Sequence, residues 1–74
     1  MKIFYSVEFS DGDKIEMTKD DDGMIEYTVK AFEGDEVKIK TFRVCDYGAE
    51  AYEKAIRFFD VKCAEMERAR GLLS

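Results

Sequence analysis

The chain has 74 residues and a net charge of −5, from 17 acidic and 12 basic residues. Its 46% of apolar residues can form one hydrophobic core, which argues against disorder, while the acidic balance argues against avid nucleic-acid binding. No apolar run is long enough to span a bilayer, and the two cysteines, Cys45 and Cys63, are too few for a disulfide framework. We therefore expect one cytoplasmic domain over residues 1–74, with reduced and buried thiols.

Four short segments between residues 2 and 45 alternate between apolar and polar side chains, which is the period of half-buried strands. Turns that each contain a glycine separate them, so we expect an antiparallel meander. The last segment changes phase, because Phe42 and Val44 do not alternate with Val37 and Ile39. We expect a β-bulge near Lys40 and Thr41 to correct this. The side chains predicted to face the core are Ile3, Tyr5, Val7, Phe9, Ile15, Met17, Ile25, Tyr27, Val29, Ala31, Val37 and Ile39.

Residues 48–70 predict one long helix, since apolar side chains recur there at steps of three or four. At 1.5 Å per residue the helix would be roughly 34 Å long, whereas strands of eight residues span roughly 26 Å. We therefore expect the helix to extend beyond the sheet. Its end, with Met66, Leu72 and Leu73, would form a subunit contact or fold back on the sheet. The predicted apolar stripe consists of Ala49, Tyr52, Ile56, Phe59, Cys63 and Met66.

Together these elements predict an α+β fold of order ββββα. A meander of three to four antiparallel strands (residues 2–45) would have one long C-terminal helix (48–70) packed across one face. The chain has no histidine and no glycine-rich loop before the helix, so we expect neither an enzyme nor a cofactor. The stretch Asp20–Gly23 lacks the ligand spacing of an EF-hand loop, so we expect no metal site.

The acidic residues concentrate in the three turns. In a meander the first and third turns lie at the same end of the sheet, and the second turn lies at the other, near the start of the helix. Two interpretations remain open: Asp and Gly favour turns and keep a small protein soluble, or the carboxylates form a negative surface that steers a basic partner. The acidic residues of the turns are Asp11, Asp13, Asp20, Asp21, Asp22, Glu33, Asp35 and Glu36.

The sheet face away from the helix is predicted to carry mixed charge and two exposed aromatic residues, Phe4 and Phe32. Two exposed aromatic rings on one face suggest a contact patch. The acidic residues Glu8, Glu16 and Glu26 would share this face with the basic residues Lys2, Lys14, Lys30, Lys38, Lys40 and Arg43.

Residues 41–59 resemble the strand-to-helix segment of the apetala-type DNA-binding domain, which occurs in plant ethylene-response factors, apicomplexan regulators and phage integrases. The resemblance extends over residues 14–62, and it implies strands backed by one helix, with DNA read through the open sheet face. The chain departs from the family's Arg and Trp pattern on that face, where it has Glu16, Thr18, Glu26 and Thr28. The positions that match are Phe42, Tyr47, Gly48, Ala51, Ala55 and Ile56.

These observations predict a small acidic protein-binding module. The specific hypothesis is an inhibitor from a phage or mobile element that blocks the basic nucleic-acid site of a defence complex such as CRISPR–Cas, as anti-CRISPR proteins do. One alternative is an apetala-type DNA-binding module that uses Lys14, Lys30, Lys38, Lys40 and Arg43, and another is a homodimeric scaffold joined through the helix. The predicted partner-binding residues are Phe4, Asp11, Asp13, Glu16, Asp20, Asp21, Asp22, Glu26, Phe32, Glu33, Asp35 and Glu36.

Overall fold

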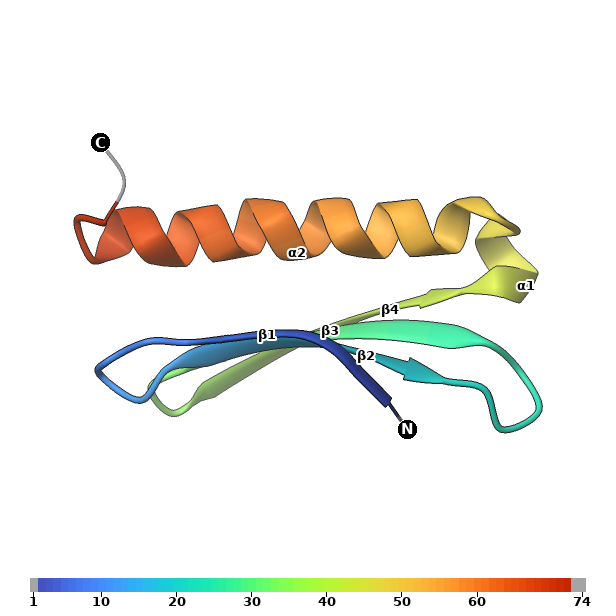
Figure 1. Ribbon diagram of the computed structural model, residues 1–74, viewed down its shortest axis with the longest axis horizontal. Helices are drawn as coiled ribbons and strands as arrows, with labels where there is room; N and C mark the ends of the chain where they lie inside the picture. Colours follow the sequence, from blue (N-terminus) through green and yellow to red (C-terminus); the bar gives the residue numbers. More distant parts are fainter. Residues whose placement is uncertain (1, 73–74) are drawn as a thin grey trace.

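A computed structural model describes residues 2–72 of the chain. Four antiparallel strands pair in sequence order, and a helix lies along one face of the sheet they form (Figure 1). This confirms the predicted α+β arrangement of a meander followed by a long helix. The elements are β1 (Lys2–Glu8), β2 (Lys14–Asp20), β3 (Glu26–Glu33), β4 (Glu36–Arg43), the short helix α1 (Val44–Tyr47) and α2 (Glu50–Ala69).

The hydrophobic core lies between α2 and the two central strands. Ala51 and Ala55 are fully buried, because small side chains allow the helix to approach the sheet closely. Larger residues flank them on both sides: Tyr52 packs on Tyr27 with 5.4 Å between ring centroids, and Phe58 lies 6.0 Å from Phe42. The buried core residues are Phe9, Ile15, Met17, Val29, Ala31, Phe42, Ala51, Ala55, Phe59 and Met66.

The predicted apolar stripe is therefore wrong in the first half of the helix. There the buried positions are Ala51 and Ala55, one residue before the predicted Tyr52 and Ile56. Ala49 is exposed, and Tyr52 keeps 37% of its surface exposed. Phe59 and Met66 are buried as predicted. The periodicity alone favoured the larger side chains, but the tight helix–sheet contact selects the alanines and moves the rings to the flanks.

The helix was predicted to extend beyond the sheet, but the C-terminal part of α2 is packed on it. Met66 is 1% exposed, and Arg70 lies just after the helix with its guanidinium 4.4 Å from the ring centroid of Phe9. The helix is shorter than expected, since Gly48 takes φ 60° and ψ −140° and separates α1 from α2. Leu72 is 62% exposed, and Leu73 lies outside the described residues.

Strand β1 contains a bulge that the sequence did not predict. Its register with β2 shifts between Ile3 and Tyr5, so that Phe4 and Tyr5 both contact aromatic rings on the helix side. Ile3 pairs with Thr18 and is 59% exposed. The prediction that Ile3 faces the core and Phe4 faces solvent is therefore wrong, because the shift reverses the alternation at this point.

Strand β4 has no bulge, contrary to the prediction. Its register with β3 is continuous from Glu36 to Arg43. Because Phe42 is buried on the helix side, regular alternation places Lys38 and Lys40 on that same side and leaves Val37 and Ile39 on the open face. The large aromatic side chain sets the phase of the strand, and the two smaller aliphatic residues follow from it.

The first and third turns lie at the same end of the sheet, as expected for a meander. The backbone N–H of Gly34, in the third turn, donates a hydrogen bond of 2.9 Å to Oδ1 of Asp13 in the first. Gly34 has φ 60° while Asp35 has negative φ, which is the pattern of a two-residue type II′ hairpin. The second turn lies at the other end, where the N–H of Val44 donates to the carbonyl of Ile25.

Candidate functional site

Most of the carboxylates at the end formed by the first and third turns have partners within the fold. Arg70 Nε donates a hydrogen bond of 2.9 Å to Oδ2 of Asp11, and its Nη2 pairs with Asp13. Lys62 Nζ lies 2.7 Å from Oε1 of Glu33. The N–H of Asp13 and the Arg70 guanidinium hold the pKa of Asp11 below its ordinary value. These acids attach the end of α2 to the sheet. Of the five acidic residues in the first and third turns, only Asp35 and Glu36 have no described cation within 4.0 Å.

The second turn keeps its carboxylates free of ion pairs. Asp20 accepts a hydrogen bond of 3.1 Å from the N–H of Asp22, and none of Asp20, Asp21 and Asp22 has a described cation within 4.0 Å. Exposed Met24 (49%) and Ile25 (38%) follow directly in the sequence. The structure therefore divides the acidic residues of the turns into two sets. Asp11, Asp13 and Glu33 are paired, whereas Asp35 and Glu36 at the same end and the three aspartates of the second turn have no described ion pair.

The open face of the sheet carries balanced charge. Arg43 Nε lies 3.1 Å from Oε1 of Glu26, and Glu16 is the cross-strand neighbour of Lys30 in the β2–β3 ladder. The hydroxyls of Thr28 and Thr41 lie 3.3 Å apart between these charges. Opposite charges alternate across the strands here, so this face does not concentrate positive charge.

The two aromatic residues predicted to be exposed on this face are both covered. Phe4 is on the helix side, packed against the core, with its ring centroid 6.1 Å from that of Tyr27. Phe32 does belong to the open face, but it is half-buried and Lys14 Nζ lies 5.0 Å from its ring centroid. The predicted aromatic contact patch is therefore absent from the described part of the open face.

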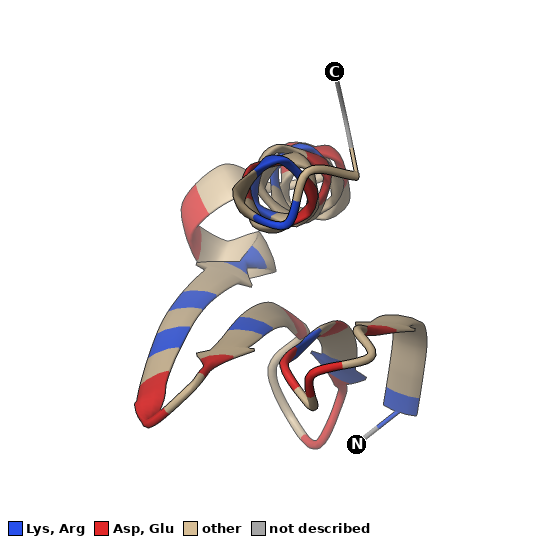
Figure 2. Ribbon diagram, turned by 90° about the vertical axis from the view of Figure 1, so that its left-hand side faces the viewer, with Lys and Arg blue, Asp and Glu red and all other residues tan. Residues whose placement is uncertain are grey.

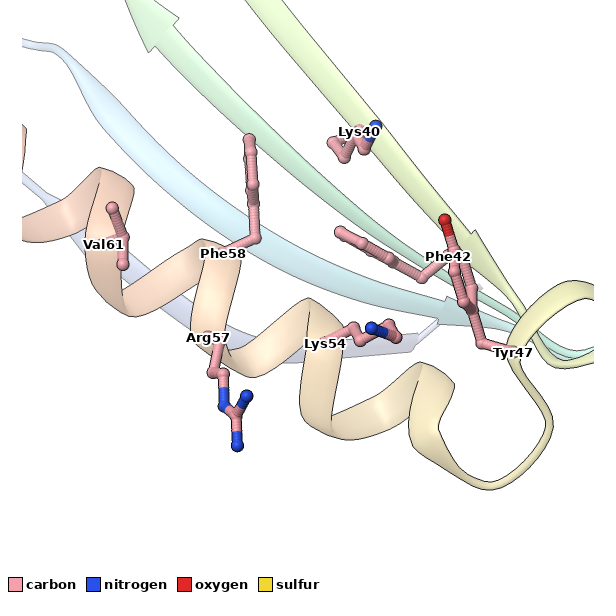
Figure 3. A pocket seen from close by; sticks show the side chains of 7 residues that line it. All are labelled: Lys40, Phe42, Tyr47, Lys54, Arg57, Phe58 and Val61. Atoms are coloured by element: carbon pink, nitrogen blue, oxygen red, sulfur yellow. The ribbon is translucent and has the colours of Figure 1, made fainter.

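Two adjoining pockets between the edge strand and the helix collect the basic residues instead. The larger has a volume of 390 Å³, and Figure 3 shows Phe42 and Phe58 within it, with Arg57 at the rim pointing away from the sheet. The smaller, of 200 Å³, shares Phe58 and Val61 with it. We call the two together the β4–α2 groove. It is lined by Lys38, Lys40, Phe42, Tyr47, Lys54, Arg57, Phe58, Val61, Lys62 and Glu65.

The cations of this groove are mostly free of carboxylates. Of the 12 Lys and Arg residues, eight have no described carboxylate within 4.0 Å, and four of these eight line the groove: Lys38, Lys40, Lys54 and Arg57. Lys54 Nζ lies 5.3 Å from the ring centroid of Tyr47, and Lys40 Nζ lies 5.9 Å from that of Phe42. Cation–π contacts of this kind hold the ammonium groups over an aromatic floor without neutralising them.

Lys38 and Lys40 lie on the helix side of β4 and not on the open face, where they were predicted, and the rest of the groove was not predicted. Lys54 and Arg57 are exposed and lie outside the apolar stripe predicted for the helix, and their position beside β4 was not predicted. Phe42 could have indicated the correct face. If Phe42 is assumed to be buried, the alternation of the strand places Lys38 and Lys40 on the helix side as well. The resulting arrangement can bind an anion beside an apolar group, and it has no histidine to move a proton.

A third pocket lies on the opposite flank of α2 and is lined by aromatic side chains. Its volume is 460 Å³, and its lining residues are Phe4, Tyr5, Tyr27 and Tyr52. The hydroxyls of Tyr5 and Tyr52 lie 3.3 Å apart, and this hydrogen bond, with burial, raises the pKa of Tyr52. No charged side chain lines this pocket, so it lacks a group that would orient a charged ligand.

The cysteines differ in exposure. Cys45 is exposed, contrary to the prediction of a buried thiol, and its Sγ lies 3.4 Å from Sδ of Met24. Cys63 is half-buried, and burial together with the hydrogen bond to Glu67 raises the pKa of its thiol. Both are free thiols.

Comparisons with protein-family models, curated proteins and solved structures find no match to this chain. Within residues 2–72, no helix combines the length and the apolar character that crossing a membrane requires. In the same range, no three His, Cys, Asp or Glu side chains are grouped so that they could hold a metal ion.

Proposed function

We propose that this chain is a small non-enzymatic binding module that takes an acidic segment of a partner protein into the β4–α2 groove. The observation that carries the proposal is the gathering of four unpaired cations around Phe58 and Val61, in a chain whose net charge is −5. An anion brought to this groove would be attracted by these four cations together.

The surroundings of the groove favour a polypeptide over a nucleic acid. A duplex would extend beyond the groove and meet the free carboxylates of Asp35 and Glu36 at one end of β4, which repel phosphates. Figure 2 shows the red tip of the β3–β4 hairpin next to the blue bands of β4. A polypeptide can place carboxylates on the lysines and apolar side chains on Phe58 and Val61 within a short length.

Chemical-shift perturbation of the backbone amides tests this proposal. Hexaglutamate, titrated at low salt, should shift the amides of β4 and α2, and the variant Lys40→Glu/Lys54→Glu should lose the response. The matched control Lys2→Glu/Arg68→Glu changes the net charge equally at exposed positions outside the groove. Equal responses from both variants would show that the peptide senses net charge alone and would overturn the proposal.

The inhibitor hypothesis remains a second candidate, and the second turn is the observation that favours it. Asp20, Asp21 and Asp22 are free of ion pairs next to exposed Met24 and Ile25, so that they offer carboxylates beside an apolar anchor for a basic groove. The test measures inhibition of target-DNA cleavage by a CRISPR–Cas complex. Inhibition that disappears in Asp20→Lys/Asp21→Lys/Asp22→Lys would support this candidate, and the absence of inhibition by the parent chain would exclude that target.

The DNA-binding alternative now depends on a smaller set of residues. With Lys38 and Lys40 in the groove, the open face keeps Lys14, Lys30 and Arg43, each next to a glutamate on its own or a neighbouring strand. Fluorescence anisotropy with random-sequence duplex DNA, at low and at physiological salt, measures what affinity this face has. Tight binding that Arg43→Glu removes would favour this alternative over the groove.

A further inference from the structure

We infer that the acidic segment binds as an added β-strand on the free edge of β4, and that its sequence alternates acidic and apolar residues. This inference rests on the proposed function and specifies how the ligand binds. The same β4–α2 groove is involved, but the backbone of the edge strand now makes the main contact, in the way that sheet edges flanked by a helix recognise extended peptides.

The backbone of β4 is open to such pairing. The strand is at the outer edge of the sheet, and its residues 37–41 form no backbone hydrogen bonds beyond the β3 ladder. Glu33 and Glu36 flank the two-residue turn as a hydrogen-bonded pair, so the antiparallel alternation directs the N–H and C=O groups of Val37, Ile39 and Thr41 outward. Three consecutive outward positions form the template that a further strand needs.

The two faces of β4 favour different side chains in an added strand. Lys38 and Lys40 point into the groove, whereas Val37 (51% exposed) and Ile39 (60% exposed) lie on the open face. Side chains of an added strand alternate between the same two sides and pair with their cross-strand neighbours. Acidic residues would therefore meet the lysines, and the intervening apolar residues would cover the valine and the isoleucine.

A second copy of β4 does not satisfy this pattern. In an antiparallel pair of β4 strands, lysines 38 and 40 of both copies would lie side by side in one groove, and like charges opposite one another destabilise a sheet. Lysines on an edge strand are a recognised protection against such self-pairing. The edge therefore selects against its own sequence and favours a strand of opposite charge.

The helix supplies the second wall of the binding site. Phe58 and Val61 of α2 line both pockets of the groove, and Lys54 and Arg57 lie along the larger one. Acidic side chains that enter from the added strand would thus be attracted from β4 and from α2 together. Their carbon atoms would pack on Phe58, which combines charge pairing with apolar contact.

Three short peptides test the mode of binding. The probe is acetyl-Glu-Val-Glu-Ile-Glu-Val-Glu-amide, and the matched control has the same composition with its glutamates in one block. The third peptide is the probe with N-methyl groups on alternate residues, which removes the donors of one edge. We expect the probe to bind about tenfold more tightly than either control, because ladder hydrogen bonds and the alternating contacts are lost in the controls.

Hydrogen exchange and charge reversal locate the bound peptide. The amides of Val37, Ile39 and Thr41 should exchange more slowly with the probe than with the N-methylated peptide. Lys38→Glu/Lys40→Glu should lose binding, while Lys2→Glu/Arg68→Glu, with the same change in charge, should retain most of it. A thermal melt of each variant confirms that the fold is intact.

The outcomes separate the inference from the proposed function. If hexaglutamate binds in the groove but the three peptides bind equally and the edge amides are unprotected, strand addition is wrong and the proposed function stands. If no acidic peptide binds at low salt, both are wrong. If an oligothymidine of the same charge binds more tightly than the probe, the groove is a nucleic-acid site and both are again overturned.

Discussion

Replacing Met66 with alanine tests whether the C-terminal half of α2 is docked on the sheet. The side chain is 1% exposed, and burial of this kind makes a Met→Ala substitution cost about 2–5 kcal/mol. The carbonyl of Met66 accepts a hydrogen bond of 2.8 Å from Arg70 Nη1, so the backbone has little freedom to close the cavity. We therefore expect a loss of about 3 kcal/mol in the free energy of unfolding.

Urea and thermal unfolding, followed by circular dichroism, measure this loss. For a domain of this size each kcal/mol lowers Tm by roughly 4–8 °C, so Met66→Ala should lower it by roughly 12–24 °C. The control is Leu72→Ala, since Leu72 is 62% exposed and should change stability by less than about 0.5 kcal/mol. If the two variants have the same stability, the end of the helix is not docked and the described packing of Met66 is wrong.

Three further predictions concern pH, backbone conformation and thiol chemistry. The pKa of Asp11 is lowered in the fold, so ionised Asp11 stabilises the folded state fully above pH 3.8, and this contribution is lost as pH falls through the pKa of the folded state. Arg70→Gln removes one cause of the shift, so its urea midpoint should change less on acidification than that of the parent. Gly48→Ala should lower stability by about 1–3 kcal/mol in the same unfolding assay, because φ 60° with ψ −140° is unfavourable for a residue with a Cβ atom. Cys45 should react with Ellman's reagent at pH 8 faster than Cys63, whose pKa is raised by burial, and equal rates in Cys45→Ser and Cys63→Ser would contradict the difference in exposure.

The fold class could be predicted because several local signals agree. Glycines at the turns and alternation between them define four strands, and the periodicity after Gly48 defines a helix. The phase of the two edge strands could not be predicted, since each contains two competing apolar sets. In β4, Val37 and Ile39 compete with Phe42, and only the contact of Phe42 with the helix decides between them.

The β4–α2 groove could not be predicted for the same reason. An error of one residue in phase moves every side chain of a strand to the other face, so Lys38 and Lys40 were assigned to the open sheet instead of the groove. The ion pairs of the first turn could not be predicted for a different reason. Arg70 and Asp11, which form one of them, are 59 positions apart in the sequence. Nothing in the local pattern of either residue indicates that contact.

The order of the elements has a consequence for synthesis of the chain. The helix that covers the apolar face follows all four strands, and its 20 residues take about 1–4 s to translate at roughly 5–20 residues per second. Hairpins form in about 1–10 μs, so the four strands can pair long before α2 has been synthesised. During that interval the nascent sheet exposes Ile15, Met17 and Val29, and charged lysines at its edge oppose its association with other nascent chains.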